Sequence, residues 1–161
     1  MPEMTLLGWF HTILGVLAVL SGFYTLYKYR VISYDVGPGK LYILVTLLVA
    51  GSALGIYNQG GFGVAHILAV LTLIALAGGY IMERYKWFGS FSKYFQALGY
   101  TTTLLFHMIP AITDFLRRLP VGDTFIDSFE DPLLLNFHLA FLVIYLVGII
   151  AQMIWLKRQV A

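Results

Sequence analysis

Long apolar runs separated by short polar stretches dominate the pattern of this chain. The runs cover residues 6–27, 41–57, 62–82, 97–116 and 133–156. A helix needs roughly 20 apolar residues to cross the hydrocarbon of a bilayer, and the second run is the shortest of the five. The pattern therefore predicts an all-α fold in one domain, residues 1–161. We expect a bundle of five transmembrane helices with the lipid bilayer as its partner.

The composition agrees with this prediction. Of the 161 residues, 60% are hydrophobic and 11% are charged, and the net charge is +2. A soluble domain carries about 25% charged residues on its water-facing surface, so these values exclude an ordinary soluble protein. The small net charge excludes nucleic acid as a partner. The chain has no cysteine, which excludes disulfides and thiolate metal sites.

The basic residues fall on one side of the predicted bundle. Eight of the ten follow the first, third and fifth runs, whereas Arg117 and Arg118 follow the fourth. Because basic residues concentrate on the cytoplasmic side, we expect an outward N-terminus and an inward C-terminus. This describes a multi-pass protein of the cell membrane, the inner membrane of a bacterium. No positive charge precedes the first run, so we expect it to be retained as a helix rather than cleaved as a signal peptide.

Four histidines are the most informative polar residues. They are His11, His66, His107 and His138, and each lies in a different apolar run. Ionisable side chains at membrane depth are costly, and they usually face the bundle interior and serve function. At a rise of about 1.5 Å per residue, all four fall in the outer half of the predicted bundle. The spacing therefore predicts one histidine site near the outer face.

Other polar residues share helical faces with the histidines. Four are expected to surround the site, namely Asp114, Tyr100, Thr103 and Tyr145. Asp114 is also placed to pair with one of the arginines that follow it. His11 lies in a stripe of small residues at positions 8, 15, 18 and 22, which predicts that it faces the interior. The same stripe would also suit a homodimer interface.

Imidazole suits iron, zinc and copper, and two arrangements fit the spacing. In the first, two histidines on facing helices ligate the iron of one haem b, and Arg117 or Arg118 pairs with its propionates. This arrangement predicts electron transfer near the outer face, with quinone or a redox protein as the partner. In the second, three or four histidines hold zinc, copper or non-haem iron, with His11, His66 and His138 as the triad.

Three classes of function follow from these arrangements. The leading hypothesis is an integral membrane protein that binds haem b for electron transfer. The second is a membrane enzyme, an oxidoreductase for example, with a histidine-ligated metal centre. The third is a metal or proton transporter that uses the histidines as a relay. A structural role stays open for each histidine, because a single one often serves as a helix–helix hydrogen-bond partner.

Three short motifs carry a resemblance to known proteins. They are Gly-Gly-Phe-Gly-Val-Ala-His at 60–66, Leu-Phe-His-Met-Ile-Pro at 105–110 and Arg-Arg-Leu-Pro at 117–120. On these motifs, residues 60–132 resemble a family of small bacterial integral membrane proteins of unknown function, which implies a membrane location and no established activity. Histidines placed one per span also resemble b-type cytochromes. Those proteins commonly stack ligand pairs near both faces of the bilayer, whereas these histidines lie near one.

Overall fold

The computed structural model describes residues 5–57 and 61–159, and these ranges are mainly helical. The predicted all-α class is confirmed. Five α-helices and one 3₁₀ turn follow each other along the described chain: α1 (Leu6–Tyr29), α2 (Gly37–Ala53), α3 (Val64–Tyr85), η1 (Gly89–Phe91), α4 (Ser92–Arg118) and α5 (Pro132–Arg158).

The helices follow the apolar runs, with one clear displacement. In the run 41–57 the helix is shifted toward the N-terminus, because α2 begins at Gly37 and ends at Ala53. Pro38 lies in its first turn, where a missing N–H costs nothing. At the other end, Gly55 N donates to Ser52 O at 3.0 Å in a turn that ends the helix. The sequence Asn58-Gln59-Gly60-Gly61 after α2 predicts a tight turn, and of these four residues only Gly61 lies within the described ranges.

Three helices are long and apolar enough to cross a membrane, namely α1, α3 and α5. α2 is apolar but has 17 residues, fewer than the roughly 20 that a span needs. α4 has 27 residues, but polar side chains along its length lower its hydropathy, among them Thr101, Thr102, Thr103, His107 and Asp114. The structure therefore supports a membrane protein with three apolar helices of spanning length.

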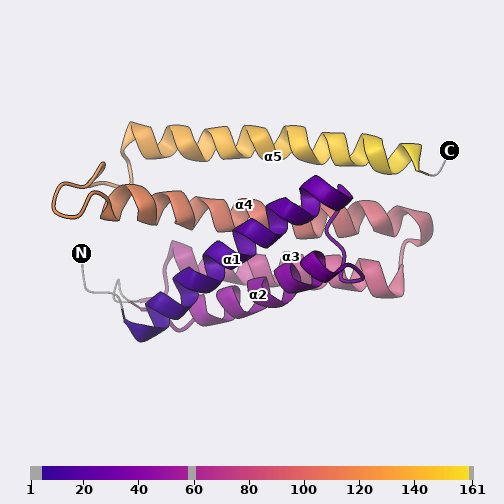
Figure 1. The fold of residues 1–161 in the computed structure, drawn as a ribbon, viewed down its shortest axis with the longest axis horizontal. Helices are drawn as coiled ribbons and strands as arrows, with labels where there is room; N and C mark the ends of the chain where they lie inside the picture. The colour runs from indigo at the N-terminus through magenta and orange to yellow at the C-terminus, as the bar shows by residue number, and fades with distance from the viewer. Residues whose placement is uncertain (1–4, 58–60, 160–161) are drawn as a thin grey trace.

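The helices form a layered bundle (Figure 1). α2, α3, α4 and α5 run roughly along the long axis, and α1 crosses the bundle obliquely. α1 packs on α2 and on α4, α3 packs between α2 and α4, and α5 lies along α4. α5 also reaches the end of α1, because Gln152 Nε2 donates to Arg30 O at 2.7 Å. In its N-terminal half α1 diverges from α5 (Figure 1).

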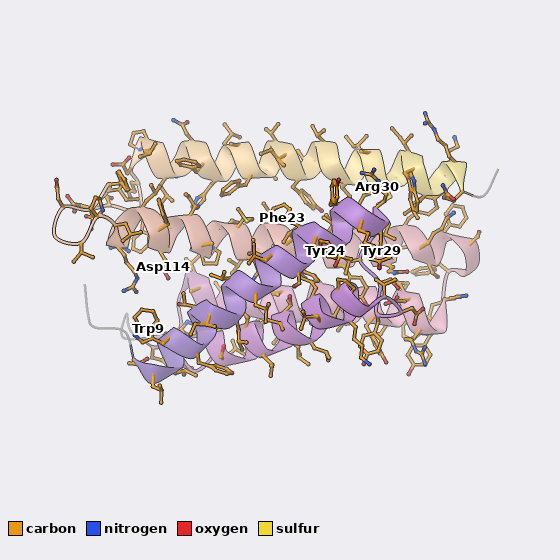
Figure 2. All side chains as sticks on the ribbon, in the orientation of Figure 1. Trp9, Phe23, Tyr24, Tyr29, Arg30 and Asp114 are labelled. Carbon is orange, nitrogen blue, oxygen red and sulfur yellow. The ribbon has the colours of Figure 1, made fainter. Side chains whose placement is uncertain are left out.

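One end of the bundle is basic. α1, α3 and α5 end there, and α2 and α4 begin there (Figure 1). The eight basic residues predicted for the inner side therefore lie at this end: Lys28, Arg30, Lys40, Arg84, Lys86, Lys93, Lys157 and Arg158. Aromatic side chains mark both ends of α1, with Trp9 at one end and Tyr24 and Tyr29 at the other (Figure 2). Aromatic residues at two levels are typical of a protein in a bilayer.

The core lies where α1, α2, α3 and α4 meet. Tyr42 and Tyr100 are fully buried in it, and two glycines make room for their rings. A Cβ at Gly22 would lie 2.8 Å from the Tyr42 ring, and a Cβ at Gly79 would lie 2.7 Å from the Tyr100 ring. The predicted interior stripe of α1 is confirmed at residues 8, 18 and 22, which are buried.

The connection from α4 to α5 folds back on the bundle without a helix of its own. Residues 124–129 are compatible in sequence with a short amphipathic helix, but the structure shows turns and bends there. Ile126 is buried against Leu116 and Leu134, and its N–H donates to Leu116 O at 3.3 Å. This connection closes one side of the cavity described next.

Candidate functional site

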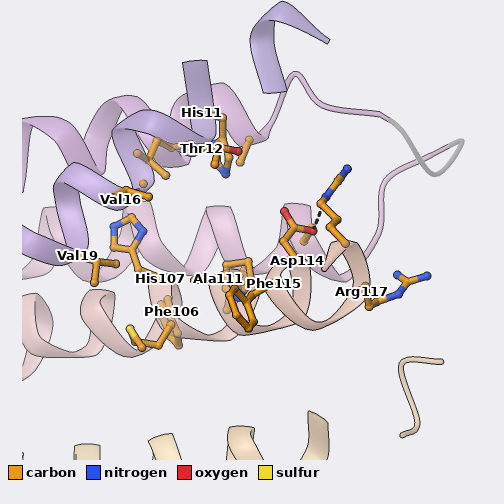
Figure 3. Close-up of a pocket in the computed structure, with 18 of the residues that line it drawn as sticks. His11, Thr12, Val16, Val19, Phe106, His107, Ala111, Asp114, Phe115 and Arg117 are labelled. Carbon is orange, nitrogen blue, oxygen red and sulfur yellow. Dashed lines mark hydrogen bonds and ion pairs between the residues drawn. The ribbon is translucent and has the colours of Figure 1, made fainter. Parts of the chain in front are cut away.

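A cavity of about 900 Å³ lies between the N-terminal half of α1 and the C-terminal half of α4 (Figure 3). α2, α3 and the connection after α4 complete its walls. Most of the lining is apolar, and five charged or imidazole side chains interrupt it: His11, His107, Asp114, Arg117 and Arg118. Each of these five was predicted as a site residue from the sequence. The structure therefore brings half of the ten predicted residues to one cavity.

His11 is held by α2 through one ring nitrogen. Nδ1 lies 3.1 Å from Val49 O and 3.1 Å from Ser52 Oγ. Ser52 donates its own proton to Val49 O at 2.9 Å, so both oxygens can only accept, and Nδ1 carries the proton. No hydrogen bond reaches Nε2 from the residues that the structure describes. His11 thus lines the cavity with a ring that is fixed at Nδ1.

His107 is anchored from the other side of the cavity. Its Nε2 lies 3.0 Å from Thr46 Oγ1 of α2, and its ring meets the Tyr42 ring edge-on, with centroids 6.2 Å apart. The Tyr42 hydroxyl lies 2.6 Å from Thr103 Oγ1. Because Thr103 gives its proton to Tyr100 O at 2.7 Å, Tyr42 is the donor of that pair. Figure 3 shows the His107 ring turned from α4 toward α1, beside Val16.

Two arginines stand at the mouth of the cavity, where α4 ends. Arg118 Nε lies 3.6 Å from Asp114 Oδ1, the ion pair drawn in Figure 3. The Arg117 guanidinium lies 3.8 Å above the centre of the Phe129 ring. The Nε atoms of both arginines are buried and have no hydrogen-bond partner among the described residues. The mouth therefore holds two cations with unused donors beside one carboxylate.

His66 and His138 do not line this cavity. His66 accepts a 3.2 Å hydrogen bond from Gly63 N at the start of α3, and its ring lies between Tyr57 and Phe62, at 4.7 and 5.0 Å between centroids. His138 Nε2 lies 3.2 Å from Thr113 Oγ1, in the contact between α4 and α5. Within residues 5–57 and 61–159 no three His, Asp or Glu side chains are grouped to hold a metal ion.

The other predicted supporting residues bond elsewhere. The Tyr100 hydroxyl donates to Glu83 Oε2 at 2.8 Å, Thr103 bonds to Tyr42, and the Tyr145 hydroxyl lies 2.8 Å from Thr102 Oγ1. Two further α2 residues orient the cavity histidines and were not among the predicted site residues, namely Thr46 and Ser52. Their signal in the sequence is weak, because each is a lone hydroxyl residue in an apolar run.

Fold and site together define a class, a helical bundle with three apolar helices long enough to cross a membrane and a cavity lined by two histidines. No family model, no curated protein and no solved structure matches the chain. The resemblance over residues 60–132 stays a prediction.

Proposed function

We propose that this protein is a membrane haem b protein, with one haem in the cavity between α1 and α4 and His11 as an axial ligand. The hydrogen bonding of His11 carries the proposal. Histidines that ligate metals commonly donate their second ring N–H to a carbonyl or carboxylate, which fixes the tautomer and raises the basicity of the ligating nitrogen. His11 has this arrangement, with Nδ1 on Val49 O and Nε2 left for the iron.

The rest of the cavity fits the same group. A haem has a flat apolar ring and two carboxylates on one edge. Apolar walls from four helices would take the ring, and Arg117 and Arg118 stand at the mouth where the propionates would lie. Arginine is well suited to this role, since its planar donors match a carboxylate. When bound, the haem would supply reversible one-electron chemistry, which the chain's own side chains do not offer.

We further propose that all five helices cross the bilayer and that the basic end faces the cytoplasm. The concentration of eight basic residues at one end supports this orientation. The cavity then lies near the outer face. Val16, Leu20 and Phe115 line the cavity and are also exposed on the surface, at 55%, 63% and 51%. A cavity that reaches a lipid-facing surface favours a membrane-dissolved electron partner such as quinone.

The test is an absorption spectrum of detergent-purified protein with a haem assay. We expect a Soret band that shifts on reduction by dithionite, at one haem per chain. His11→Ala should lose most of the haem, because the axial ligand is removed. His66→Ala and His138→Ala are matched controls outside the cavity, and both should keep it.

Two results would count against the proposal. A wild-type protein expressed with ample haem and purified without a Soret band has no haem site, and the proposal fails. Haem loss in His66→Ala or His138→Ala, with retention in His11→Ala, would mean that the wrong histidine was assigned. Circular dichroism of each variant separates loss of haem from loss of fold.

A further inference from the structure

We infer that His107 does not ligate the haem iron, and that the cavity keeps the sixth coordination position open for a small diatomic or anionic ligand. The inference rests on the proposed function, because it concerns the second face of the same haem. It replaces the two-histidine ligation expected from the sequence with ligation by His11 alone. The protein would then bind an exogenous ligand and would be more than an electron carrier.

The first observation is that Nε2 of His107 points away from the open space. It lies 3.0 Å from Thr46 Oγ1, and Thr46 is fully buried on α2. To present Nε2 to an iron in the cavity, the ring would have to leave this partner and turn over. Both groups would lose their hydrogen bond in an apolar interior, where an unpaired polar group is costly.

The second observation concerns the nitrogen that remains. Nε2 of His107 is hydrogen-bonded to Thr46 Oγ1. Nδ1 is therefore the ring nitrogen that has no hydrogen bond with any described residue. Nδ1 is bonded to the ring carbon that carries Cβ, so an iron bound there would bring the porphyrin against the backbone of α4. Nε2 projects beyond the side chain and avoids this collision. The nitrogen left available on His107 is therefore the one less suited to a haem.

The third observation is that the ring of His107 is firmly packed. His107 is 7% exposed, and the Tyr42 ring that meets it edge-on is fully buried. Tyr42 is itself fixed by its hydrogen bond to Thr103 at 2.6 Å and by close contact with Gly22. A ring flip would disturb this whole contact. We expect His107 to stay beside the open face, as a polar neighbour of a bound ligand.

The test uses the spin state and carbon monoxide binding of the purified haem protein. We expect high-spin haem in the ferric form, and a Soret shift on adding carbon monoxide to the ferrous form, at one carbon monoxide per haem. His107→Leu should keep both properties, because no iron bond is removed. Thr46→Val keeps the volume of the side chain but releases Nε2, and we expect it to raise the low-spin fraction. That rise should disappear in the double variant His107→Leu with Thr46→Val.

The outcomes separate this inference from the proposal beneath it. Haem that is low-spin in both oxidation states and does not bind carbon monoxide overturns the open position and leaves the haem proposal standing. In that case His107→Leu and Met108→Leu identify the sixth ligand, since Met108 also lines the cavity. Protein without any haem overturns both.

Discussion

The hydroxyl of Tyr100 donates a 2.8 Å hydrogen bond to Oε2 of Glu83, at the end of the bundle opposite the histidine cavity. The other carboxylate oxygen of Glu83 accepts from Ser33 Oγ at 2.5 Å and from Tyr34 N at 2.9 Å. One carboxylate on α3 thus joins α4 to the connection between α1 and α2. Because Tyr100 is fully buried, this contact ties the basic end of the bundle together.

Tyr100→Phe should destabilise the protein more than Tyr42→Phe does. Each change removes one hydroxyl from a fully buried tyrosine. The partner of Tyr100 is a carboxylate, and a hydrogen bond to a charged group is worth about 1.5–3 kcal/mol, against about 0.5–1.5 kcal/mol for a neutral pair such as Tyr42 and Thr103. The free energy of unfolding in mixed micelles measures both losses. Equal losses in the two variants would show that Glu83 does not act as a charged acceptor.

Two neighbouring glycines of α3 should respond differently to alanine. A Cβ at Gly79 would lie 2.7 Å from the Tyr100 ring, whereas a Cβ at Gly78 would meet nothing within 4 Å. Gly79→Ala overpacks the core and should cost about 1–3 kcal/mol of unfolding free energy. Gly78→Ala should be neutral or stabilise the protein by up to about 1 kcal/mol, because alanine is the better helix former.

The same unfolding titration in mixed micelles compares these two glycine variants directly. A loss at Gly78 as large as the loss at Gly79 would contradict the close contact between α3 and Tyr100. Circular dichroism before the titration confirms that both variants still fold.

Much of this fold can be predicted from apolar periodicity alone. Five apolar runs give five helices because burial of apolar side chains and internal backbone hydrogen bonding favour a helix in each run. The ends are less certain, since they depend on local chemistry. Pro38 starts α2 earlier than the apolar run does, and the turn at Gly55 ends it earlier. Neither effect changes the hydropathy of the run.

The site was harder to predict, because depth along a helix does not determine the direction of a side chain. All four histidines lie in the outer half of the predicted bundle, but the rotation of each helix decides which cavity its histidine meets. His11 and His107 meet the same cavity, whereas Gly63 and Thr113 engage His66 and His138. Thr113 contacts His138 through tertiary packing, and Gly63 contacts His66 at the start of a helix. The spacing of the histidines in the sequence predicts neither contact.

The arginines at the cavity mouth should control haem retention. Replacing both Arg117 and Arg118 with glutamine removes the charged partners proposed for the propionates. We expect haem transfer to an acceptor protein to become about 100-fold faster, since two charge-assisted hydrogen bonds are removed and each is worth about tenfold. Arg84→Gln, at the opposite end of the bundle, is the control and should leave the rate unchanged.

Asp114→Asn should slow haem transfer to an acceptor protein or leave its rate unchanged. The change removes the Asp114 carboxylate, which competes with a haem propionate for Arg118. The Arg118 guanidinium is then free to bind the propionate. The pair is partly exposed, with the Asp114 side chain 60% and the Arg118 side chain 30% exposed, so its loss should change the unfolding free energy by about 1 kcal/mol or less. Stopped-flow haem transfer and the unfolding titration give the two values. Faster haem loss in Asp114→Asn would contradict the proposed role of the arginines.

The orientation can be tested cleanly because the chain has no cysteine. Ser90 and Ser128 are exposed, and α4 is the one helix between them. With the basic end in the cytoplasm, Ser128→Cys should react with a membrane-impermeant maleimide on intact cells, and Ser90→Cys should react after the membrane is permeabilised. Labelling of both cysteines from outside would show that α4 does not cross the bilayer. Labelling of Ser90→Cys alone from outside would invert the orientation, and the histidine cavity would then lie near the cytoplasmic face.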